Sequence, residues 1–408
     1  MKTTTELPPT NRPRSRASTR WRTLAAFVSL SMVVAAPVGA QTPISSVGLG
    51  VPVPSIDARA AALGGTGLGL RDGSLSARNP ADIALFGRPA LGITYAPEGA
   101  SVEGDDGSLD TGRSRMAVLR GAVPFEGWAV GVAFASELDQ DWQVEFSDTL
   151  AATDGEYPFT EQRSQDGGIS SVNLTAARDL GSLAVGVEYA ILTGRTQLRY
   201  RREFEPALDD PSSVLNPSTG RATWQYGGSR VRVGASLPLG DRVQVGADVS
   251  LSGELTAERD TVAGPAGTRR YDMPAAMEAG GSARVSDRLL LAGAGGWTGW
   301  AGAEGGSDEY VASNVTWFGV GAELTGTRLL GASVPLRLGI RRTGLPFHAP
   351  GTEQPSETAV TLGLGVRVAE EKARLDFALE LGSRGDLAGS GVEEGFRRLS
   401  LSLAIFQD

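Results

Sequence analysis

The sequence predicts an all-β, fourteen-stranded antiparallel transmembrane β-barrel with a small N-terminal hatch or plug segment. Three observations predict it: apolar residues alternate with small or polar ones along many segments, short and long connectors take turns between them, and an export-like N-terminus precedes them. Between Val360 and Val368, every even position is Val or Leu and every odd position between them is Thr, Gly or Arg. Successive side chains of a strand point to opposite faces, so such a segment has one apolar face. A soluble sandwich would need bulky residues on its inward face, where these segments place small and ionisable ones.

Residues 1–40 are predicted to be an export signal. Lys2 and five arginines precede a short apolar core at 24–36, and the small residues Val38-Gly39-Ala40 allow cleavage before Gln41. A membrane anchor is the alternative, but the core is short for a bilayer-spanning helix. Cleavage would remove six basic groups and one acidic group, which changes the formal net charge from -9 to -14. We therefore expect no nucleic-acid partner for such an acidic mature chain.

Composition narrows the chemistry that the chain can perform. The 408 residues include no cysteine and a single histidine, His348. Disulfides, thiolate nucleophiles and cysteine metal sites are therefore excluded, and most imidazole chemistry is removed. His348 lies in a predicted extracellular loop with no serine nucleophile motif nearby, so we interpret it as an ordinary loop residue. We expect neither catalytic residues, nor a bound metal, nor a cofactor, and the chain is not predicted to be an enzyme.

The barrel is predicted to span residues 90–408. Its fourteen strands are expected near 90–96, 114–123, 128–136, 169–178, 183–195, 223–237, 242–255, 273–285, 289–300, 314–325, 334–344, 357–368, 373–383 and 396–406. Tight turns such as 124–127 and 179–182 alternate with long polar connectors such as 97–113 and 137–168. Bacterial outer-membrane barrels have an even number of strands, short periplasmic turns and long extracellular loops. Both ends of the barrel are therefore expected on the periplasmic side.

The last strand and the aromatic residues give weaker support. Leucine and isoleucine alternate with Ser and Ala in 396–406, and a strand of this kind near the C-terminus resembles the signal that the outer-membrane assembly machinery reads. Gln407 and Asp408 follow Phe406, which departs from that signal. Aromatic residues near strand ends, including Trp128, Trp300 and Trp317, fit either interfacial girdles or ordinary packing.

Residues 41–89 do not alternate and are rich in Gly, Ala and Pro. Arg59 and small residues lead into Gly64-Gly65, then Asp72 and Asn79-Pro80-Ala81 precede the first strand. This arrangement resembles the outer-membrane long-chain fatty-acid transporters (FadL and TodX type) and the related PorV/PorQ-like barrels of type IX secretion. The resemblance implies a hatch inside a fourteen-stranded barrel of a Gram-negative outer membrane. It also makes these seven positions the tentative hatch or ligand residues: Arg59, Gly64, Gly65, Asp72, Asn79, Pro80 and Ala81.

The residues themselves support a hatch, with alternatives. Irregular backbone cannot face lipid with its polar groups unpaired, so 41–89 must lie in or under the lumen or outside the bilayer. Asn79-Pro80-Ala81 also fits a simple turn into the first strand. The glycines from Gly65 to Gly69 lack the spacing, the preceding strand and the lysine of a phosphate-binding loop.

Charged residues on the non-aliphatic face of the strands are predicted to line the lumen, because a mid-depth arginine facing lipid would cost roughly 2–4 kcal/mol. They are Glu188, Arg230, Arg232, Asp248, Arg337, Arg341, Arg367, Asp376 and Glu380. They could form a polar pathway or an arginine clamp for a ligand carboxylate. A network of ion pairs between hatch and wall is the favoured interpretation, because both signs occur in similar number.

These expectations about the fold lead to a hypothesis about function. The leading hypothesis is a porin-like outer-membrane channel for passive uptake of hydrophobic, fatty-acid-like small molecules. The lumen face offers few large apolar residues, but hatch or loop residues such as Leu63, Leu68 and Ile83 could supply a pocket. The alternatives are a PorV-like accessory barrel that docks or shuttles secreted proteins, and a general diffusion porin. Expected partners are outer-membrane lipid, a hydrophobic ligand, the assembly machinery and, for the accessory barrel, secretion components.

Overall fold

The computed structural model describes residues 43–70, 75–104, 107–152, 155–206, 215–260, 267–303, 305, 309–329, 332–368 and 372–407, all within one compact unit, Gly39–Asp408. The expected export signal and Asp72 therefore lie outside the described residues. None of the helices in the described ranges is long and apolar enough to cross a membrane.

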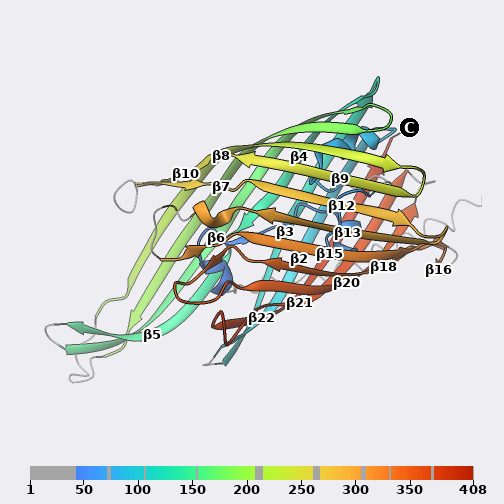
Figure 1. The fold of residues 1–408 in the computed structure, drawn as a ribbon. Coiled ribbons are helices and arrows are strands. Elements are labelled where there is room, and N and C mark those ends of the chain that lie inside the picture. Colours follow the sequence, from blue (N-terminus) through green and yellow to red (C-terminus); the bar gives the residue numbers. More distant parts are fainter. Residues whose placement is uncertain are drawn as a thin grey trace, which may run out of the picture. The chain divides into compact units, whose positions relative to one another are not determined.

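The wall is a closed ring of antiparallel strands (Figure 1). In order around the ring they are β2 (Ala90–Gly104), β3 (Gly107–Phe125), β4 (Trp128–Asp139), β6 (Gly155–Asp179), β7 (Ala184–Phe204), β8 (Ser218–Leu239), β9 (Val243–Ser252), β12 (Ala276–Arg284), β13 (Leu289–Thr298), β15 (Val315–Leu324), β18 (Leu336–Gly344), β20 (Ser356–Val368), β21 (Ala373–Asp386) and β22 (Val392–Phe406). The ring closes where β22 pairs with β2, with Ala90 opposite Phe406. Closure leaves no open sheet edge, which is the condition for crossing a bilayer with strands. The predicted fourteen-stranded antiparallel barrel is confirmed.

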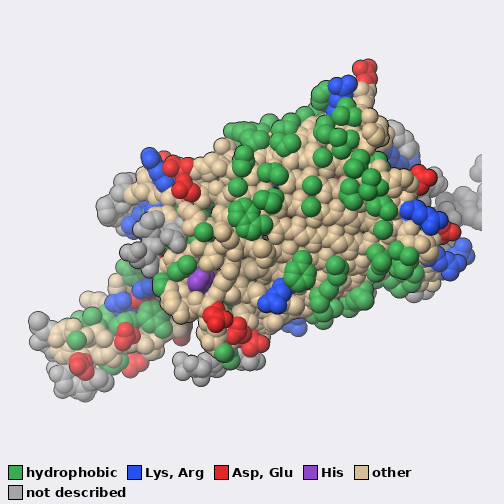
Figure 2. All heavy atoms as spheres, viewed as in Figure 1, with side chains coloured by type: hydrophobic (Ala, Val, Ile, Leu, Met, Phe, Trp, Pro, Cys, Tyr) green, Lys and Arg blue, Asp and Glu red, His purple; other side chains and the backbone are tan. Residues whose placement is uncertain are grey.

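Side chains alternate along the wall as the sequence predicted. On β4, Val130 and Val132 are 45% and 55% exposed, whereas Ala129 and Ala133, which flank this pair, are buried. The same contrast recurs on β15, where Phe318 and Val320 face outward and Trp317 is buried. Figure 2 shows hydrophobic side chains over the body of the barrel and most charged ones near its two ends. The outer surface therefore presents an apolar belt of the kind that faces lipid.

The strands run farther than predicted at the end opposite the C-terminus. The expected strand 169–178 is part of the longer β6, and the expected connector 137–168 contains a further strand, β5 (Trp142–Ala152), which pairs with β6. Likewise, the expected connector 97–113 is mostly strand, because β2 and β3 pair along it. Backbone pairing continues into water where no apolar face is required, so the alternating pattern ends before the strands do. At the other end the turns are tight: Glu126 and Gly127 alone connect β3 to β4, both with positive φ, as in a type I′ hairpin.

The N-terminal segment adds no strand to the ring in its described residues. It contains η2 (Pro43–Ser46), β1 (Val51–Pro52), α2 (Ala58–Ala62) and η3 (Pro80–Leu85). The alanine-rich α2 begins at Asp57, whose Oδ1 accepts a hydrogen bond from the Ala60 amide at 2.8 Å, a typical N-cap. The β3–β4 ladder stops at Val118–Ala135, and the free end of β4 pairs instead with β1. Elements of this segment thus contact wall strands from different parts of the ring.

Candidate functional site

The helix α2 is attached to the inner face of the wall by a chain of buried ion pairs. Arg59 donates from Nε and Nη2 to the two carboxylate oxygens of Glu323 on β15, each at 2.9 Å. Glu323 also accepts a hydrogen bond from Arg337 Nε at 2.7 Å, and Arg337 Nη1 donates to Asp376 at 2.7 Å. Arg374 Nε completes the chain by donating to Asp376 at 2.6 Å. Each of these side chains is at most 10% exposed. This network therefore links the charge of Arg59 on α2 to charged side chains of three wall strands.

Glycines let the backbone of the segment approach the wall. Gly64 has φ +74°, and a Cβ there would lie 2.5 Å from the Ile340 oxygen and 2.7 Å from the Val320 oxygen. On the wall, a Cβ at Gly319 would lie 1.8 Å from Gly64 O, and one at Gly339 would lie 2.4 Å from Gly64 N. Small residues on the inner face of the wall thus make room for the N-terminal segment. Beside Gly64, Gly65 has φ +80°, with the Arg341 side chain 3.2 Å from where its Cβ would lie.

The tripeptide Asn79-Pro80-Ala81 forms the start of η3 against the opposite strands. Asn79 caps η3: its Oδ1 accepts from the Ala81 amide at 2.9 Å, while its Nδ2 donates to the Ala235 carbonyl of β8 at 2.8 Å. A Cβ at Gly234 would lie 2.1 Å from Asn79 Oδ1, and one at Gly186 would lie 2.5 Å from the Pro80 backbone. The Asn side chain is fully buried, so both of its hydrogen bonds form away from water. The turn and the attachment to the wall are therefore made by the same residues.

Most of the charged residues that were expected to line the lumen lie in ion pairs. Arg230 binds Glu137 through two hydrogen bonds of 2.8 and 2.7 Å, and Arg232 lies 3.4 Å from Glu188 and 3.5 Å from Asp248. Farther round the ring, Arg341 Nη2 contacts Glu357 at 2.5 Å and Glu380 at 2.7 Å. Arg337 and Asp376 belong to the α2 network. Arg367 is exposed near the end of β20, opposite Arg374 of β21 in the ladder.

The largest ion-pair cluster contains residues that sequence reasoning did not identify. Glu98 accepts hydrogen bonds from Arg113, Arg384 and Arg398, and Arg384 also contacts Glu357 and Glu394. Arg384 and Glu394 are completely buried. Glu98 was assigned to a polar connector, although it is directly opposite Arg398 and Arg113 in the two ladders of β2. Opposite charges at paired positions of neighbouring strands would have revealed this cluster, but the pairing register of the strands is not known from the sequence.

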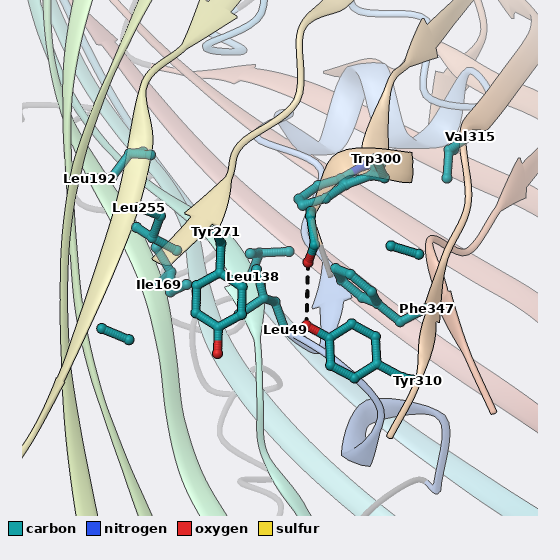
Figure 3. Close-up of a cluster of buried hydrophobic side chains, with 13 residues drawn as sticks. Leu49, Leu138, Ile169, Leu192, Leu255, Tyr271, Trp300, Tyr310, Val315 and Phe347 are labelled. Carbon is teal, nitrogen blue, oxygen red and sulfur yellow. Dashed lines mark hydrogen bonds between the residues drawn. The ribbon is translucent and has the colours of Figure 1, made fainter. Parts of the chain in front are cut away.

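Large apolar side chains gather inside the barrel near the end opposite the C-terminus (Figure 3). This mouth cluster consists of Leu49, Leu138, Ile169, Leu192, Leu255, Ala257, Tyr271, Trp300, Ala303, Tyr310, Ala312, Val315 and Phe347. Several members come from connector elements: η5 (Trp300–Gly302), β10 (Glu254–Arg259), β11 (Thr268–Asp272), β14 (Val311–Ala312) and β19 (Phe347–His348). Phe347 packs edge-on against both Trp300 and Tyr310, with ring centroids 5.4 and 5.5 Å apart. The connectors thus provide an apolar interior at this end.

A cavity of about 190 Å³ lies between the mouth cluster and the N-terminal segment. Its lining includes Leu138, Trp300 and Val315 of the mouth cluster and residues 51–55 of the segment. Leu63, Leu68 and Ile83, which we named as residues that could supply a pocket, do not line this cavity. They are fully buried without lining the cavity; Leu63 and Ile83 pack in other clusters, with small wall residues such as Ala292 and Ala129. Their apolar surface is used for packing the segment against the wall.

His348 has a hydrogen-bonded serine that the sequence did not reveal. Its Nε2 lies 3.1 Å from Ser313 Oγ, and its Nδ1 lies 3.2 Å from the Ala349 oxygen. Within the described part of the chain, no group of three His, Asp or Glu side chains is arranged to hold a metal ion.

Neither family models nor curated protein sequences match this chain. Among solved structures, the Ralstonia pickettii toluene transporter TbuX aligns with a TM-score of 0.55 and 16% identity, over 87% of this chain and 99% of that one. A Pseudomonas aeruginosa FadL homologue gives 0.60 and 14%, over 87% and 99%. The Pseudomonas putida toluene transporter TodX gives 0.54 and 12%, over 87% and 98%. At this identity the likeness concerns the fold: the chain has the fourteen-stranded barrel fold of the FadL, TodX and TbuX outer-membrane transporters.

Proposed function

We propose that the protein is an outer-membrane channel for passive uptake of small hydrophobic molecules. The observation that carries the proposal is the cavity of about 190 Å³, because it joins the apolar mouth cluster to the N-terminal segment inside a closed barrel. A hydrophobic solute could leave water at the mouth cluster, rest in the cavity and pass on when the segment shifts. In this role residues 41–89 are a hatch, and Asn79 and the Arg59–Glu323 pair hold it in place. Residues 1–40 would direct export to the outer membrane.

The fold comparisons support the class of solute, not its identity. TbuX and TodX are described as toluene transporters. A cavity of about 150 Å³ is known to accept benzene, so one of about 190 Å³ has the size for a single substituted aromatic ring. We therefore favour monoaromatic compounds over long acyl chains as the solutes of this cavity.

The ion pairs distinguish this proposal from a general diffusion porin. Glu98 is 4% exposed and Arg384 is completely buried, although both belong to the inner face of the wall. A water-filled pore would leave such charges hydrated, since burying them costs several kcal/mol per ion before pairing. We expect single channels in planar bilayers to show little ion conductance; large, steady conductance would favour the porin. An accessory barrel for secretion would instead copurify with stoichiometric protein partners.

Uptake by a cavity-filled variant tests the proposal. Thr298 lines the cavity, and Thr298→Trp should occupy much of it. The matched control is Thr316→Trp on the neighbouring strand β15, where the side chain is exposed on the lipid side. We expect protein-dependent toluene entry into cells or lipopolysaccharide-containing vesicles, reduced severalfold by Thr298→Trp and unchanged by Thr316→Trp. Equal entry with and without the protein would rule out the proposed function.

A further inference from the structure

The outer face of the wall has an apolar groove near the end that carries the C-terminus. The groove has a volume of about 800 Å³ and crosses the outer faces of β2, β3, β4, β6, β7 and β22. Its exposed apolar side chains include Leu91, Val132, Leu174, Tyr189 and Ile405. Ligand sites in proteins usually have volumes of about 300–1,000 Å³, so the groove has the size of a ligand site.

Two small residues among larger ones form the floor of the groove. Gly121 on β3 faces outward like the exposed Val123, and it is paired with Leu91 on β2 and Val132 on β4. A Cβ at Gly121 would have Leu91 Cδ1, 3.7 Å away, as its nearest neighbour, so the space above Gly121 is open. Ala176 on β6 lies between valines of β4 and β7 in the same way. Atoms that line an unfilled groove lose van der Waals contacts, and a lipid chain lying in the groove would restore them.

A cation lies at the end of the groove that is nearest the tight turns. Arg178 is exposed and follows Ala176 on the same face of β6, about 7 Å farther along the strand. It is paired with Trp128 of β4, and its Cζ lies 5.0 Å from the centroid of a Trp128 ring. In the described part of the chain, Arg178 forms no ion pair, either with Asp179 or with Glu126 of the neighbouring turn. The indole ring therefore orients the guanidinium while its N–H groups face the surroundings.

The position of the groove along the wall selects one leaflet of the membrane. Gly121 lies about 13 Å along the strand from Phe125, the last residue of β3. Tight turns and the C-terminus mark the periplasmic end of an outer-membrane barrel, whose apolar belt is about 25 Å tall. The groove therefore lies in the periplasmic half of the belt, with Arg178 and Trp128 near the edge where indole rings gather. Glycerophospholipids, which combine acyl chains with a phosphate, form that leaflet.

We infer that the groove binds one glycerophospholipid of the periplasmic leaflet, with an acyl chain over Gly121 and Ala176 and the phosphate on Arg178. Phosphate oxygens accept charge-assisted hydrogen bonds from a guanidinium, and such bonds are about twice as strong as neutral ones. The bound lipid has both a groove for its chain and a cation for its phosphate. The inference concerns the outer wall and does not depend on which solute passes through the lumen.

Native mass spectrometry of the purified full-length protein, released from detergent micelles, tests the phosphate contact. The two probes are palmitoyl-oleoyl-phosphatidylglycerol and the diacylglycerol with the same chains, which lacks the phosphate. We expect one phospholipid to bind at least about tenfold more tightly than the diacylglycerol, the ratio that one charge-assisted hydrogen bond supplies. Arg178→Gln should remove this advantage, and Arg178→Lys should restore part of it. The control Arg242→Gln, at an exposed turn residue of the same end outside the groove, should keep it.

Filling the groove tests the acyl-chain contact. Gly121→Leu should weaken phospholipid binding severalfold. The matched control is Gly293→Leu on β13, outside the groove: the nearest neighbour of a Cβ there is the exposed Val320, whose Cγ1 is also 3.7 Å away. Folding is checked by gel mobility before and after boiling, and Ala176→Leu replaces Gly121→Leu if that variant does not fold.

Three results would overturn the inference. The first is equal affinity for the two probes, and the second is an equal loss of phospholipid binding in Gly121→Leu and Gly293→Leu. The third is a wild-type dimer that becomes a monomer in Gly121→Leu, because a second copy of the chain would then cover the groove. Toluene influx is not part of these measurements, so their failure and the failure of the proposed function are distinguishable.

Discussion

The attachment of the hatch to the wall through Glu323 leads to a quantitative prediction. Glu323→Gln keeps the size of the side chain but removes the charge that pairs with both Arg59 and Arg337. Arg337 keeps its 2.7 Å contact with Asp376, so the main loss falls on the Arg59 contact with the hatch. Removing one partner of a buried ion pair destabilises a protein by about 3–5 kcal/mol. We expect about 3 kcal/mol, because glutamine still has one oxygen that can accept from Arg59.

Hydrogen exchange measured by mass spectrometry can locate this loss. If α2 detaches while the wall stays folded, amides near residues 58–64 open locally, and 3 kcal/mol corresponds to exchange roughly 100-fold faster. Peptides from the wall strands should exchange as in the wild type. The matched control is Asp166→Asn, which breaks the Arg199–Asp166 pair, whose side chains are 55% and 53% exposed. An exposed pair contributes about 1 kcal/mol or less. Exchange near α2 within threefold of the wild type in Glu323→Gln would refute the reasoning.

Three further predictions concern the hatch and the outer loops, each measured as a urea unfolding midpoint in lipid vesicles. Gly64→Ala should destabilise the protein by more than Gly127→Ala. Both glycines have positive φ, but a Cβ at Gly127 has no atom within 4 Å, whereas a Cβ at Gly64 meets two carbonyl oxygens. Equal effects would show that the close approach of Gly64 to the wall is unimportant. Asn79→Asp should lower stability by roughly 2 kcal/mol, because a carboxylate replaces the donor to the Ala235 carbonyl, and an unchanged midpoint would contradict the assigned hydrogen bond. Burial, together with nearby Asp139, raises the pKa of Asp141, between β4 and β5, from its ordinary 3.8 to about 6. The folded state then holds this proton more tightly than the unfolded chain. The stability of the wild type, measured relative to that of Asp141→Asn, should therefore fall as pH rises from about 4 to about 6. A stability difference between the two proteins that does not change with pH would disprove the pKa shift.

The wall could be predicted from the sequence because its pattern is local. The alternation of apolar and polar side chains in segments such as 360–368 reflects a single strand between lipid and lumen. It can be recognised without knowledge of any distant contact. The ends of strands were less predictable, since β6 and β7 continue beyond the segments in which apolar and polar residues alternate clearly. A turn at Asn79-Pro80 was also recognisable, and Asn79 does cap η3.

The interior could not be predicted in the same way. Arg59 and Glu323 are 264 positions apart, and Arg384 and Glu98 are 286 apart, so their pairing depends on closure of the whole ring. Part of the apolar mouth cluster comes from short connector elements such as η5 and β19, which carry no periodic signal. The cavity therefore became visible only when the barrel was closed and the connectors were folded over its mouth.

Toluene influx is the measurement that tests the central claim most directly. Purified protein would be reconstituted into vesicles with a lipopolysaccharide outer leaflet, and entry of radiolabelled toluene would be followed without any energy source. The account predicts entry well above that of protein-free vesicles, saturating with concentration and lost in Thr298→Trp but not in Thr316→Trp. Influx that is independent of the protein, or equally fast through Thr298→Trp, would contradict the claim that hydrophobic molecules pass through this cavity.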